Sequence, residues 1–505
     1  MQLQWRVGSM DTWEADCLIF FVVEKEAEFL PGFGKWLRDE GRWLAGCSAL
    51  SDFQGKPQQT AVFYAPQDRK IPRVICAGLG PREKLDAERL RGGAAAALRQ
   101  CRELKLARPA LPATALDGLP LERSRSLEEA LIGGMGGLYR FTALKTRDVD
   151  AESFPESLLL FSEVEPDDAF HAAASYAESL VSGISLARDL VVAPGNQVTP
   201  TFMAEIAQGL AESYGFRLRL INLQEAEKMG MGAFAAVARG SREPACIIVL
   251  EHCPPGMDED PPIVFVGKGI TFDTGGISLK PSAKMEAMKQ DMAGAAAVLG
   301  AFEVLGRTRF QKRVLGIMPC TENMPDGKAY KPGDVIQSMS GLTVEVISTD
   351  AEGRMILCDA ITFALQYKPA ILLDLATLTG ACIVALGNEA AGIMGNRDEL
   401  VEELCTLGAE VGERLWPLPL WDSYFDYIKS DIADFKNVGE RSAGTIVGGI
   451  FLKQFVTDET PWAHIDIAGT AWTEKDIASS PKGATGFGVR LLTEVLKRRP
   501  KLGWG

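Results

Sequence analysis

Histidine is scarce in this sequence. Only three histidines occur among its 505 residues, and they lie far apart at His171, His252 and His464. A zinc site of the H-E-x-x-H type needs two histidines one helical turn apart, so this kind of site is excluded. A Ser-His-Asp mechanism would need one of the three, and no G-x-S-x-G turn accompanies them. If this protein binds a metal, oxygen atoms must supply most of the ligands.

Closely spaced cysteines are also missing. The ten cysteines are scattered along the chain, and no two have the C-x-x-C spacing of a zinc or redox site. Several lie in apolar runs, as Cys76 does between Ile75 and Ala77, which is typical of small core residues. We therefore predict reduced thiols and a cytoplasmic protein.

Long hydrophobic runs and a basic stripe are missing as well. No apolar run reaches the roughly 18 residues that a membrane-spanning helix needs, and residues 1–10 lack a basic leader followed by an apolar core. We therefore expect neither a membrane span nor a secretory signal. The net charge of −14 argues against a nucleic-acid partner, which needs a basic stripe to displace counterions from phosphates. The basic run at residues 497–499 is typical of a solvated helix end.

The composition, 47% hydrophobic and 24% charged, is that of an ordinary globular protein whose length favours two or three domains. In the first part, runs rich in β-branched and aromatic residues alternate with stretches of helical spacing. The predicted strands are residues 17–23, 60–65, 73–80 and 158–161, and the predicted helices are residues 86–104 and 127–144. This alternation predicts a smaller N-terminal α/β domain at residues 1–165.

A long helical stretch at residues 170–190 ends at Ala193-Pro194-Gly195-Asn196. We predict that residues 166–190 bridge to a larger catalytic domain at residues 191–505. Its predicted strands are residues 217–221, 246–250, 263–266, 314–318, 344–347 and 371–375, and its clearest helices are residues 288–305 and 354–365. Continuous apolar strands are typical of a mostly parallel central sheet flanked by helices. The predicted fold class is therefore α/β with two domains.

Polar residues cluster at three places in the second domain. Lys268 and Asp273 follow one predicted strand, Asp291 lies on a helical stretch, and Asp350 and Glu352 follow another strand. In open α/β sheets the ligand site lies at the carboxyl ends of the strands. Carboxylates that meet there repel one another unless a cation joins them, and two divalent ions sharing carboxylates resolve the repulsion. The sequence therefore predicts a two-metal hydrolytic site, in which Asp350 and Glu352 both point inward only if the backbone between them stays extended.

Two other functions stay open on these residues. A two-metal phosphoesterase also uses carboxylates, although basic residues beside the cluster are few. The phosphate-loop pattern G-x-x-x-x-G-K-[ST] does not match, because Ile270 follows Gly267-Lys268-Gly269. The non-enzymatic alternative is a binding or scaffolding protein. The acidic charge balance and the lack of a clear basic stripe in residues 1–160 argue against one that binds DNA.

These segments resemble the leucyl aminopeptidase family of cytosolic metallopeptidases, whose signature reads N-T-D-A-E-G-R-L. In this sequence the signature stands as Ser348-Thr349-Asp350-Ala351-Glu352-Gly353-Arg354-Met355. The resemblance also covers residues 267–276, 280–282, 288–297, 374–380, 462–469 and 483–486. It implies a metal-dependent aminopeptidase that hydrolyses peptides with a free N-terminus through a metal-bridged water.

The resemblance also implies a role for each matching residue. One divalent ion, Mn²⁺ or Zn²⁺, would be held by Lys268, Asp273, Asp291 and Glu352. A second ion would share Asp273 and Glu352 and add Asp350. Lys280 would polarise the peptide carbonyl, and Arg354 would hold a bicarbonate ion that serves as the base. The substrate would be bound by Met288, Thr377, Leu378, Gly380 and Ala468.

Members of this family typically form hexamers, so the resemblance implies a homohexamer. The chain departs from the signature at two positions, where Ser348 replaces Asn and Met355 replaces Leu. The exchange of Leu for Met nearly conserves volume. The loss of the Asn amide is expected to change the hydrogen bonds beside the metal cage. Every ligand and catalytic position is present, which predicts an active enzyme.

Overall fold

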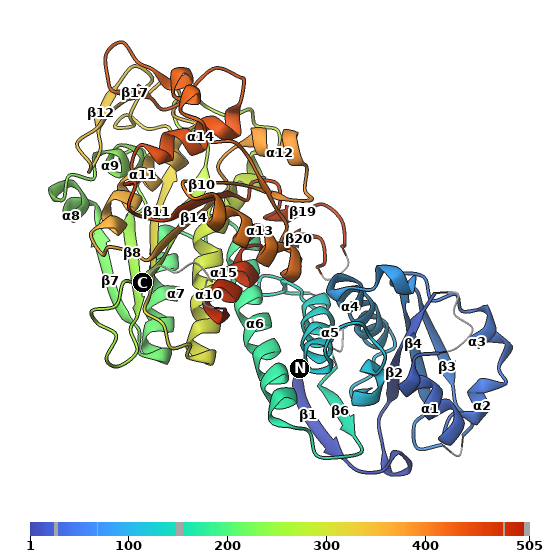
Figure 1. Cartoon of the computed structure of the whole chain (residues 1–505). Helices are drawn as coiled ribbons and strands as arrows, with labels where there is room; N and C mark the ends of the chain where they lie inside the picture. Colours follow the sequence, from blue (N-terminus) through green and yellow to red (C-terminus); the bar gives the residue numbers. More distant parts are fainter. Residues whose placement is uncertain (25–28, 68, 148–154, 478–479, 499–505) are drawn as a thin grey trace. The chain divides into compact units, whose positions relative to one another are not determined.

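The computed structural model describes residues 1–24, 29–67, 69–147, 155–477 and 480–498 (Figure 1). Arg499, the last residue of the basic run, lies outside these residues. The chain divides into two compact units, Met1–Val181 with Lys475–Lys482, and Ser182–Glu474 with Gly483–Gly505. The long helix α6 (Asp168–Val192) contributes residues to both units. Among the described residues, no helix combines the length and apolar character needed to cross a membrane.

The first unit contains a six-stranded sheet with the order β1-β6-β5-β2-β4-β3. Strand β3 is antiparallel to β4, and the other pairs are parallel. The strands are β1 (Gln2–Val7), β2 (Cys17–Val23), β3 (Thr60–Tyr64), β4 (Arg73–Gly80), β5 (Pro109–Pro112) and β6 (Ser157–Ser162). The sequence did not predict β1 or β5. Strand β5 is four residues long and begins and ends with proline, a residue that normally argues against a strand inside a sheet.

Two helices of the first unit, α4 (Ala87–Glu103) and α5 (Arg123–Gly137), pack closely against each other. A Cβ atom added to Gly133 would lie 2.3 Å from the carbonyl oxygen of Arg91. The glycines inside α5 therefore permit this approach, and the helix ends earlier than the predicted residue 144. The buried guanidinium of Arg91 pairs with Glu129 at 2.5 Å across the same contact. The shorter helices are α1 (Pro31–Asp39), α2 (Arg42–Ala45) and α3 (Ser48–Asp52).

The second unit is built on a larger sheet with the order β16-β15-β18-β14-β9-β11-β8-β7, and β10 pairs in parallel with β11. Its central strands β18, β14, β9 and β11 are parallel to one another, and β15, β8 and β7 add antiparallel pairs outside them. The strands are β7 (Arg217–Asn222), β8 (Cys246–His252), β9 (Ile263–Gly267), β10 (Gly269–Asp273), β11 (Val314–Asn323), β14 (Ile371–Ala376), β15 (Ala391–Gly395), β16 (Leu415–Pro417) and β18 (Trp462–Asp466).

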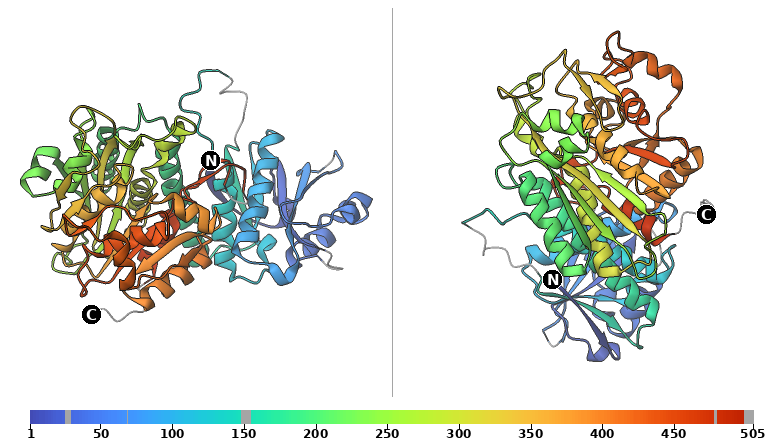
Figure 2. Two further views of the ribbon diagram at one scale, coloured as in Figure 1. Left: turned by 90° about the horizontal axis from the view of Figure 1, so that it is seen from above. Right: turned by 90° about the vertical axis from the view of Figure 1, so that its left-hand side faces the viewer.

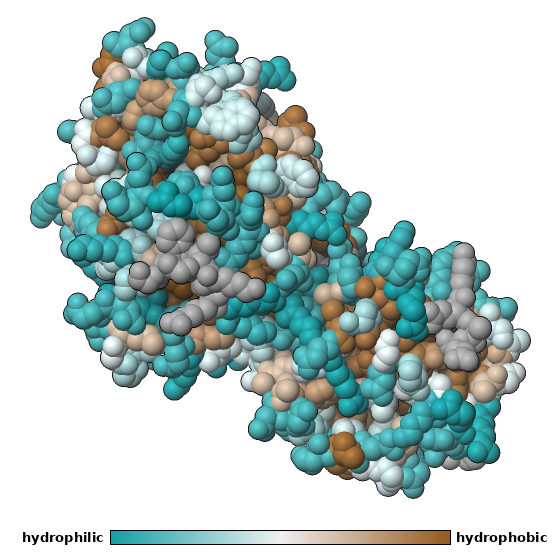
Figure 3. Space-filling view, viewed as in Figure 1, coloured by the Kyte–Doolittle hydropathy of each residue, from teal (hydrophilic) through white to brown (hydrophobic). Residues whose placement is uncertain are grey.

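Helices cover both faces of this sheet, as Figure 2 shows from two further directions. Helices α7, α10, α13 and α15 form one connected layer, and α9, α11 and α14 form another. Burial on both faces explains why β9, β14 and β18 are buried along their whole length. The helices are α7 (Pro200–Tyr214), α8 (Leu223–Lys228), α9 (Gly232–Ala238), α10 (Ala293–Thr308), α11 (Glu352–Leu365), α12 (Gly380–Leu386), α13 (Asp398–Val411), α14 (Gly444–Lys453) and α15 (Val489–Lys497). The face visible in Figure 3 is mainly hydrophilic, with apolar residues interspersed.

One predicted strand of the central sheet lies elsewhere. The run at residues 344–347 forms only β13 (Thr343–Glu345), in a small sheet with β12 (Val335–Gln337) and β17 (Phe435–Lys436). Asp350 consequently lies in a turn, and Glu352 is the first residue of α11. The extended backbone required by the sequence argument is therefore not present, and the turn brings the two side chains together instead. A final two-stranded sheet joins β19 (Trp472–Thr473) to β20 (Gly483–Ala484).

A buried histidine–aspartate pair joins two neighbouring central strands. The Nδ1 atom of His464 on β18 lies 2.5 Å from Oδ1 of Asp374 on β14, and both side chains are fully buried. The indole N–H of Trp462 donates to the other oxygen of Asp374 at 2.7 Å. Burial alone would lower the pKa of His464, but the charge and hydrogen bond of Asp374 raise it above the ordinary value. The pair is therefore most stabilising when His464 is protonated.

Replacing Gly133 with alanine should destabilise the first unit by about 1–3 kcal/mol, because the new methyl group would overlap the backbone of α4. The matched control is Gly209→Ala in α7, where nothing lies within 4 Å of the added atom. That variant should gain roughly 0.5–1 kcal/mol of stability. Thermal unfolding of both variants measures the difference, and equal shifts would contradict the close packing of α4 and α5.

The variant Asp374→Asn should lower the unfolding temperature more at pH 6 than at pH 9. The raised pKa of His464 gives stability that is fully present below its unfolded pKa of about 6.5 and is lost as the pH rises through the folded pKa. Removing the partner of a buried charge costs about 3–5 kcal/mol at the lower pH. Exposed Asp431→Asn is the control. A pH-independent effect in thermal unfolding would show that the pair is not ionised.

Candidate active site

Residues from several chain segments meet at the carboxyl edge of the central sheet. Lys268 follows β9, Asp273 ends β10, and Thr377 follows β14. Asp291 lies between the 3₁₀ helix Met285–Gln290 and α10, rather than on the predicted continuous helix. This placement agrees with the general position of ligand sites in open α/β sheets.

Three carboxylates form the centre of the site. One oxygen atom from each of Asp273, Asp350 and Glu352 lies within 4.8 Å of the other two. Asp291 joins them through Lys268, whose Nζ atom lies 2.7 Å from Asp291 and 3.0 Å from Glu352. The structure thus brings all five predicted metal ligands together.

The electrostatics of this cluster favour bound cations. Burial, and then the charge of Asp273, raise the pKa of Glu352 to about 8. Burial also raises the pKa of Asp291 to about 6, although the ammonium of Lys268 opposes this shift. Carboxylates that are hard to ionise together are strong candidates for sharing a divalent ion. Carboxylate oxygens are also ligands that suit manganese and zinc.

The two lysines lie directly among these carboxylates. Lys268 is almost fully buried and also donates to the carbonyl oxygen of Thr377 at 2.9 Å. Burial lowers the pKa of Lys268, but the charges of Asp291 and Glu352 outweigh burial and raise it above the ordinary value. A Cβ atom on Gly353 would lie 2.6 Å from Cε of this lysine, so the start of α11 needs glycine there. Lys280 lies 2.6 Å from Asp273 and also pairs with Asp350.

Arg354 lies in the buried first turn of α11, two residues after Glu352. Its Nη1 atom donates to the carbonyl oxygen of Asn437 at 2.8 Å, and its guanidinium lies over the ring of Phe451. Burial lowers the pKa of Arg354 to about 10. Its Nε atom has no hydrogen-bond partner among the described residues. A buried donor of this kind is suited to an anion.

A pocket of about 380 Å³ contains the cluster. Every predicted site residue except Arg354 lines it, including the proposed substrate contacts Met288, Leu378, Gly380 and Ala468. Ile383 on α12 also lines this pocket and was not predicted. Its apolar side chain is 43% exposed, so it is available to contact a ligand.

Asn323 is a site residue that the sequence argument missed. Its amide donates to Asp273 at 2.8 Å, and the carbonyl oxygen of Thr349 accepts from the same nitrogen at 3.0 Å. Glu352 lies 3.4 Å from this nitrogen. Asn323 therefore orients both carboxylates that the two metals would share. Its position at the end of a buried strand was the available signal, but one asparagine there is too common to be diagnostic.

Asp466 was also missed, and it positions the loop after β14. Its carboxylate accepts hydrogen bonds from the hydroxyl of Thr379 at 2.6 Å, the N–H of Leu378 at 3.1 Å and the N–H of Ala468 at 3.2 Å. These contacts hold the backbone at residues 377–380 beside the cluster. An acidic residue at the end of the apolar strand β18 was the only sequence signal.

Ser348, where the chain departs from the signature, stabilises the turn that carries Asp350. Its hydroxyl accepts from the N–H of Asp350 at 3.3 Å, and its carbonyl oxygen accepts from the amide of Asn437 at 2.6 Å. The side-chain amide of Asn437 thus binds the turn from outside the signature, and the Asn437 carbonyl binds Arg354.

Comparisons with known proteins agree with this arrangement. A family model described as the cytosol aminopeptidase family, catalytic domain, matches residues 185–493, and the model of the N-terminal domain of the same family matches residues 24–148. The chain is 61% identical over 503 residues to a probable cytosol aminopeptidase of Syntrophobacter fumaroxidans, with all of both chains covered. It is 46% identical over 505 residues to a protein of the same name from Oleidesulfovibrio alaskensis, with 98% of each covered.

Two solved structures are similar over nearly the whole chain. The bottromycin maturation enzyme BotP in complex with Mn has a TM-score of 0.83 and 32% identity, covering 96% of this chain and 99% of that one. A mutant of tomato leucine aminopeptidase has a TM-score of 0.87 and 31% identity, covering 99% and 97%. These findings confirm the resemblance and the predicted two-domain α/β fold. The chain therefore belongs to the cytosol aminopeptidase family and is a peptidase.

Proposed function

We propose that this protein releases the N-terminal residue of peptides, using two divalent ions at the carboxylate cluster. The observation that carries the proposal is the meeting of Asp273, Asp350 and Glu352, with oxygen atoms from all three within 4.8 Å of one another. Burial and the charge of Asp273 raise the pKa of Glu352, and bound ions would offset the repulsion between the two carboxylates. The manganese in the similar BotP structure supports this ion class.

The residues present fit two ions. Lys268, Asp273, Asp291 and Glu352 would hold one, and Asp273, Asp350 and Glu352 the other. Lys268 must be neutral to act as a ligand, and the charge of the ion would displace its proton. The ions would supply Lewis acidity and would lower the pKa of water at the site.

Lys280 and Arg354 have distinct roles in this proposal. Lys280 lies at the pocket wall, where its ammonium would polarise the peptide carbonyl and stabilise the oxyanion. In the metal-free site its pKa is above the ordinary value, because the charges of Asp273 and Glu352 outweigh the effect of burial. Arg354 would hold bicarbonate as the base, and an anion there is supported by its Nε atom, which has no hydrogen-bond partner among the residues that the structure describes.

The substrate would enter the pocket with its free amine toward the ions. The loop at residues 377–380, held by Asp466, offers backbone groups to the peptide main chain. Met288, Ala468 and Ile383 supply apolar surface for the first side chain. The expected homohexamer and cytoplasmic location stay predictions.

The variant Glu352→Ala should lower turnover of a leucyl anilide by about 100-fold or more, because both ions lose a shared ligand and with it several kcal/mol of transition-state stabilisation. Metal content measured by mass spectrometry should fall in parallel. Glu286→Ala is the matched control, since that glutamate is exposed and outside the pocket. Wild-type turnover in Glu352→Ala would refute the shared-ligand assignment. Phosphoester hydrolysis without peptidase activity would instead favour the phosphoesterase.

Removal of divalent ions with a chelator should abolish peptidase activity, and Mn²⁺ or Zn²⁺ should restore it. The affinity for Mn²⁺ should increase as the pH rises from about 6 to about 8, because Asp291 and Glu352 must lose their protons to act as ligands. Titration calorimetry across this range measures the dependence. An affinity that does not change with pH, or full activity after chelation, would contradict the metal assignment.

A further inference from the structure

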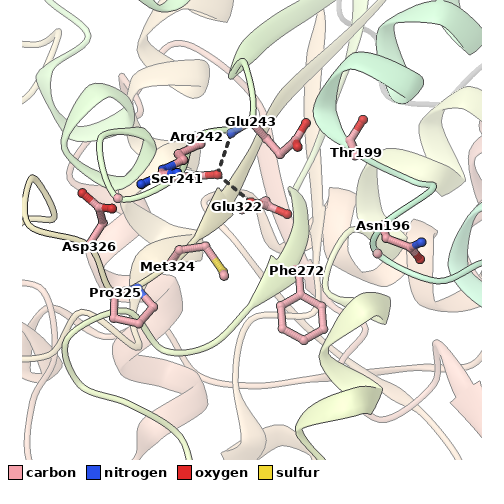
Figure 4. A pocket seen from close by; sticks show the side chains of 12 residues that line it. Asn196, Thr199, Ser241, Arg242, Glu243, Phe272, Glu322, Met324, Pro325 and Asp326 are labelled. Carbon is pink, nitrogen blue, oxygen red and sulfur yellow. Dashed lines mark hydrogen bonds between the residues drawn. The ribbon is translucent and has the colours of Figure 1, made fainter.

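The second unit of the chain, which also contains the carboxylate cluster, has a second cavity of about 620 Å³ (Figure 4). It shares no lining residue with the pocket of the carboxylate cluster. Its walls come from the segment before α7, the loop between α9 and β8, the end of β10, and β11 with the turn after it. A volume of this size is within the range of small-molecule sites, roughly 300–1,000 Å³.

The walls of this cavity are held in place by specific contacts. The hydroxyl of Ser241 donates to Glu322 at 2.5 Å and accepts from the N–H of Glu243 at 3.0 Å. Behind them, a Cβ atom on Gly240 would lie 2.4 Å from the carbonyl oxygen of Met324, so the loop packs directly on the end of β11. The cavity is therefore bounded by fixed backbone and by an oriented carboxylate.

The charges of the cavity are of both signs and lack mutual pairing. Within the described part of the chain, neither Glu243 nor Glu322 has a cationic side chain as a salt-bridge partner. Burial raises the pKa of Glu322, the hydrogen bond from Ser241 opposes this shift, and the charge of Glu243 adds to it. Arg242, which is exposed, makes no ion pair within the same residues. In Figure 4, Arg242 and Asp326 lie at one side of the cavity, while Thr199 and Asn196 lie at the other.

A ligand that satisfies these groups needs both a cationic and an anionic group. An ammonium group would neutralise the adjacent carboxylates of Glu243 and Glu322, and a carboxylate would pair with the guanidinium of Arg242 through two parallel hydrogen bonds. The ring of Phe272 and the side chain of Met324 add apolar surface. We propose that this cavity is a binding site for a free α-amino acid with an apolar side chain.

The position of the cavity links it to the carboxylate cluster. Phe272 and Glu322 line the cavity, and the next residues along their strands are Asp273 and Asn323. Successive side chains on a strand point to opposite faces. The amide of Asn323 binds Asp273 on the cluster side at 2.8 Å. The cavity and the cluster therefore lie beside the same two strands, β10 and β11.

Equilibrium dialysis with radiolabelled L-leucine tests the site without requiring turnover, so its outcome is independent of the proposed peptidase activity. The protein is the full chain treated with chelator, as wild type and as Glu352→Ala, in which metal-dependent binding at the first pocket is removed. We expect saturable binding of one leucine per chain in both. The absence of such binding overturns the proposal.

Two variants test whether leucine binds in the cavity. Arg242→Ala and Glu322→Gln should each weaken leucine binding about tenfold or more, because each removes one charge-assisted contact. Glutamine retains an oxygen that can accept from Ser241, so the wall is preserved. Arg239→Ala is the control, since Arg239 pairs with Glu227 outside the cavity. Binding unchanged in both cavity variants, with unaltered thermal unfolding, overturns the assignment.

Blocked ligands test the chemical class. N-acetyl-leucine lacks the ammonium group and leucinamide lacks the carboxylate, so each should bind about tenfold more weakly than leucine. Leucyl-leucine separates the two charges and should also bind more weakly. Equal binding of leucine and both blocked forms would show an apolar site and overturn recognition of the charged pair.

Discussion

Buried carboxylates repel one another at the carboxyl edge of the central sheet, and the surrounding structure offsets this repulsion. Burial and the neighbouring charge of Asp273 raise the pKa of Glu352 to about 8. The ammonium of Lys268 lies between Asp291 and Glu352, and that of Lys280 lies between Asp273 and Asp350. Divalent ions provide more positive charge than an ammonium in the same volume, which is why this cluster is suited to metals.

Other residues of the second unit fix the positions of these charged side chains. Asn323, at the end of β11, orients Asp273, and Asp466, at the end of β18, fixes the loop after β14. Glycine at position 353 allows α11 to begin against Lys268. Both faces of the sheet are covered, so the strands that carry these residues are rigid. Strands β10 and β11 each carry a residue that lines the second cavity, Phe272 or Glu322, directly before a residue of the cluster, Asp273 or Asn323.

Much of the fold could be predicted because several of its strands are apolar along most of their length. Strands β8, β9 and β14 were recognisable as continuous runs, whereas β5 was not, since prolines bound its four residues. The run at residues 344–347 was also apolar, but it pairs in a small separate sheet. Periodicity identifies a strand, while the partner of that strand depends on contacts between residues far apart in the chain.

The sequence alone determined the family of this protein and with it the class of reaction, peptide hydrolysis. The signature around Asp350 and Glu352 identified the family, and the scarcity of histidine predicted oxygen ligands, because residue type and spacing are local properties of the chain. The tertiary structure decided which further groups reach the cluster and where empty space remains. The roles of Asn323 and Asp466 and the cavity beside Phe272 depend on contacts between strands that are distant in sequence. No local sequence pattern indicates those contacts.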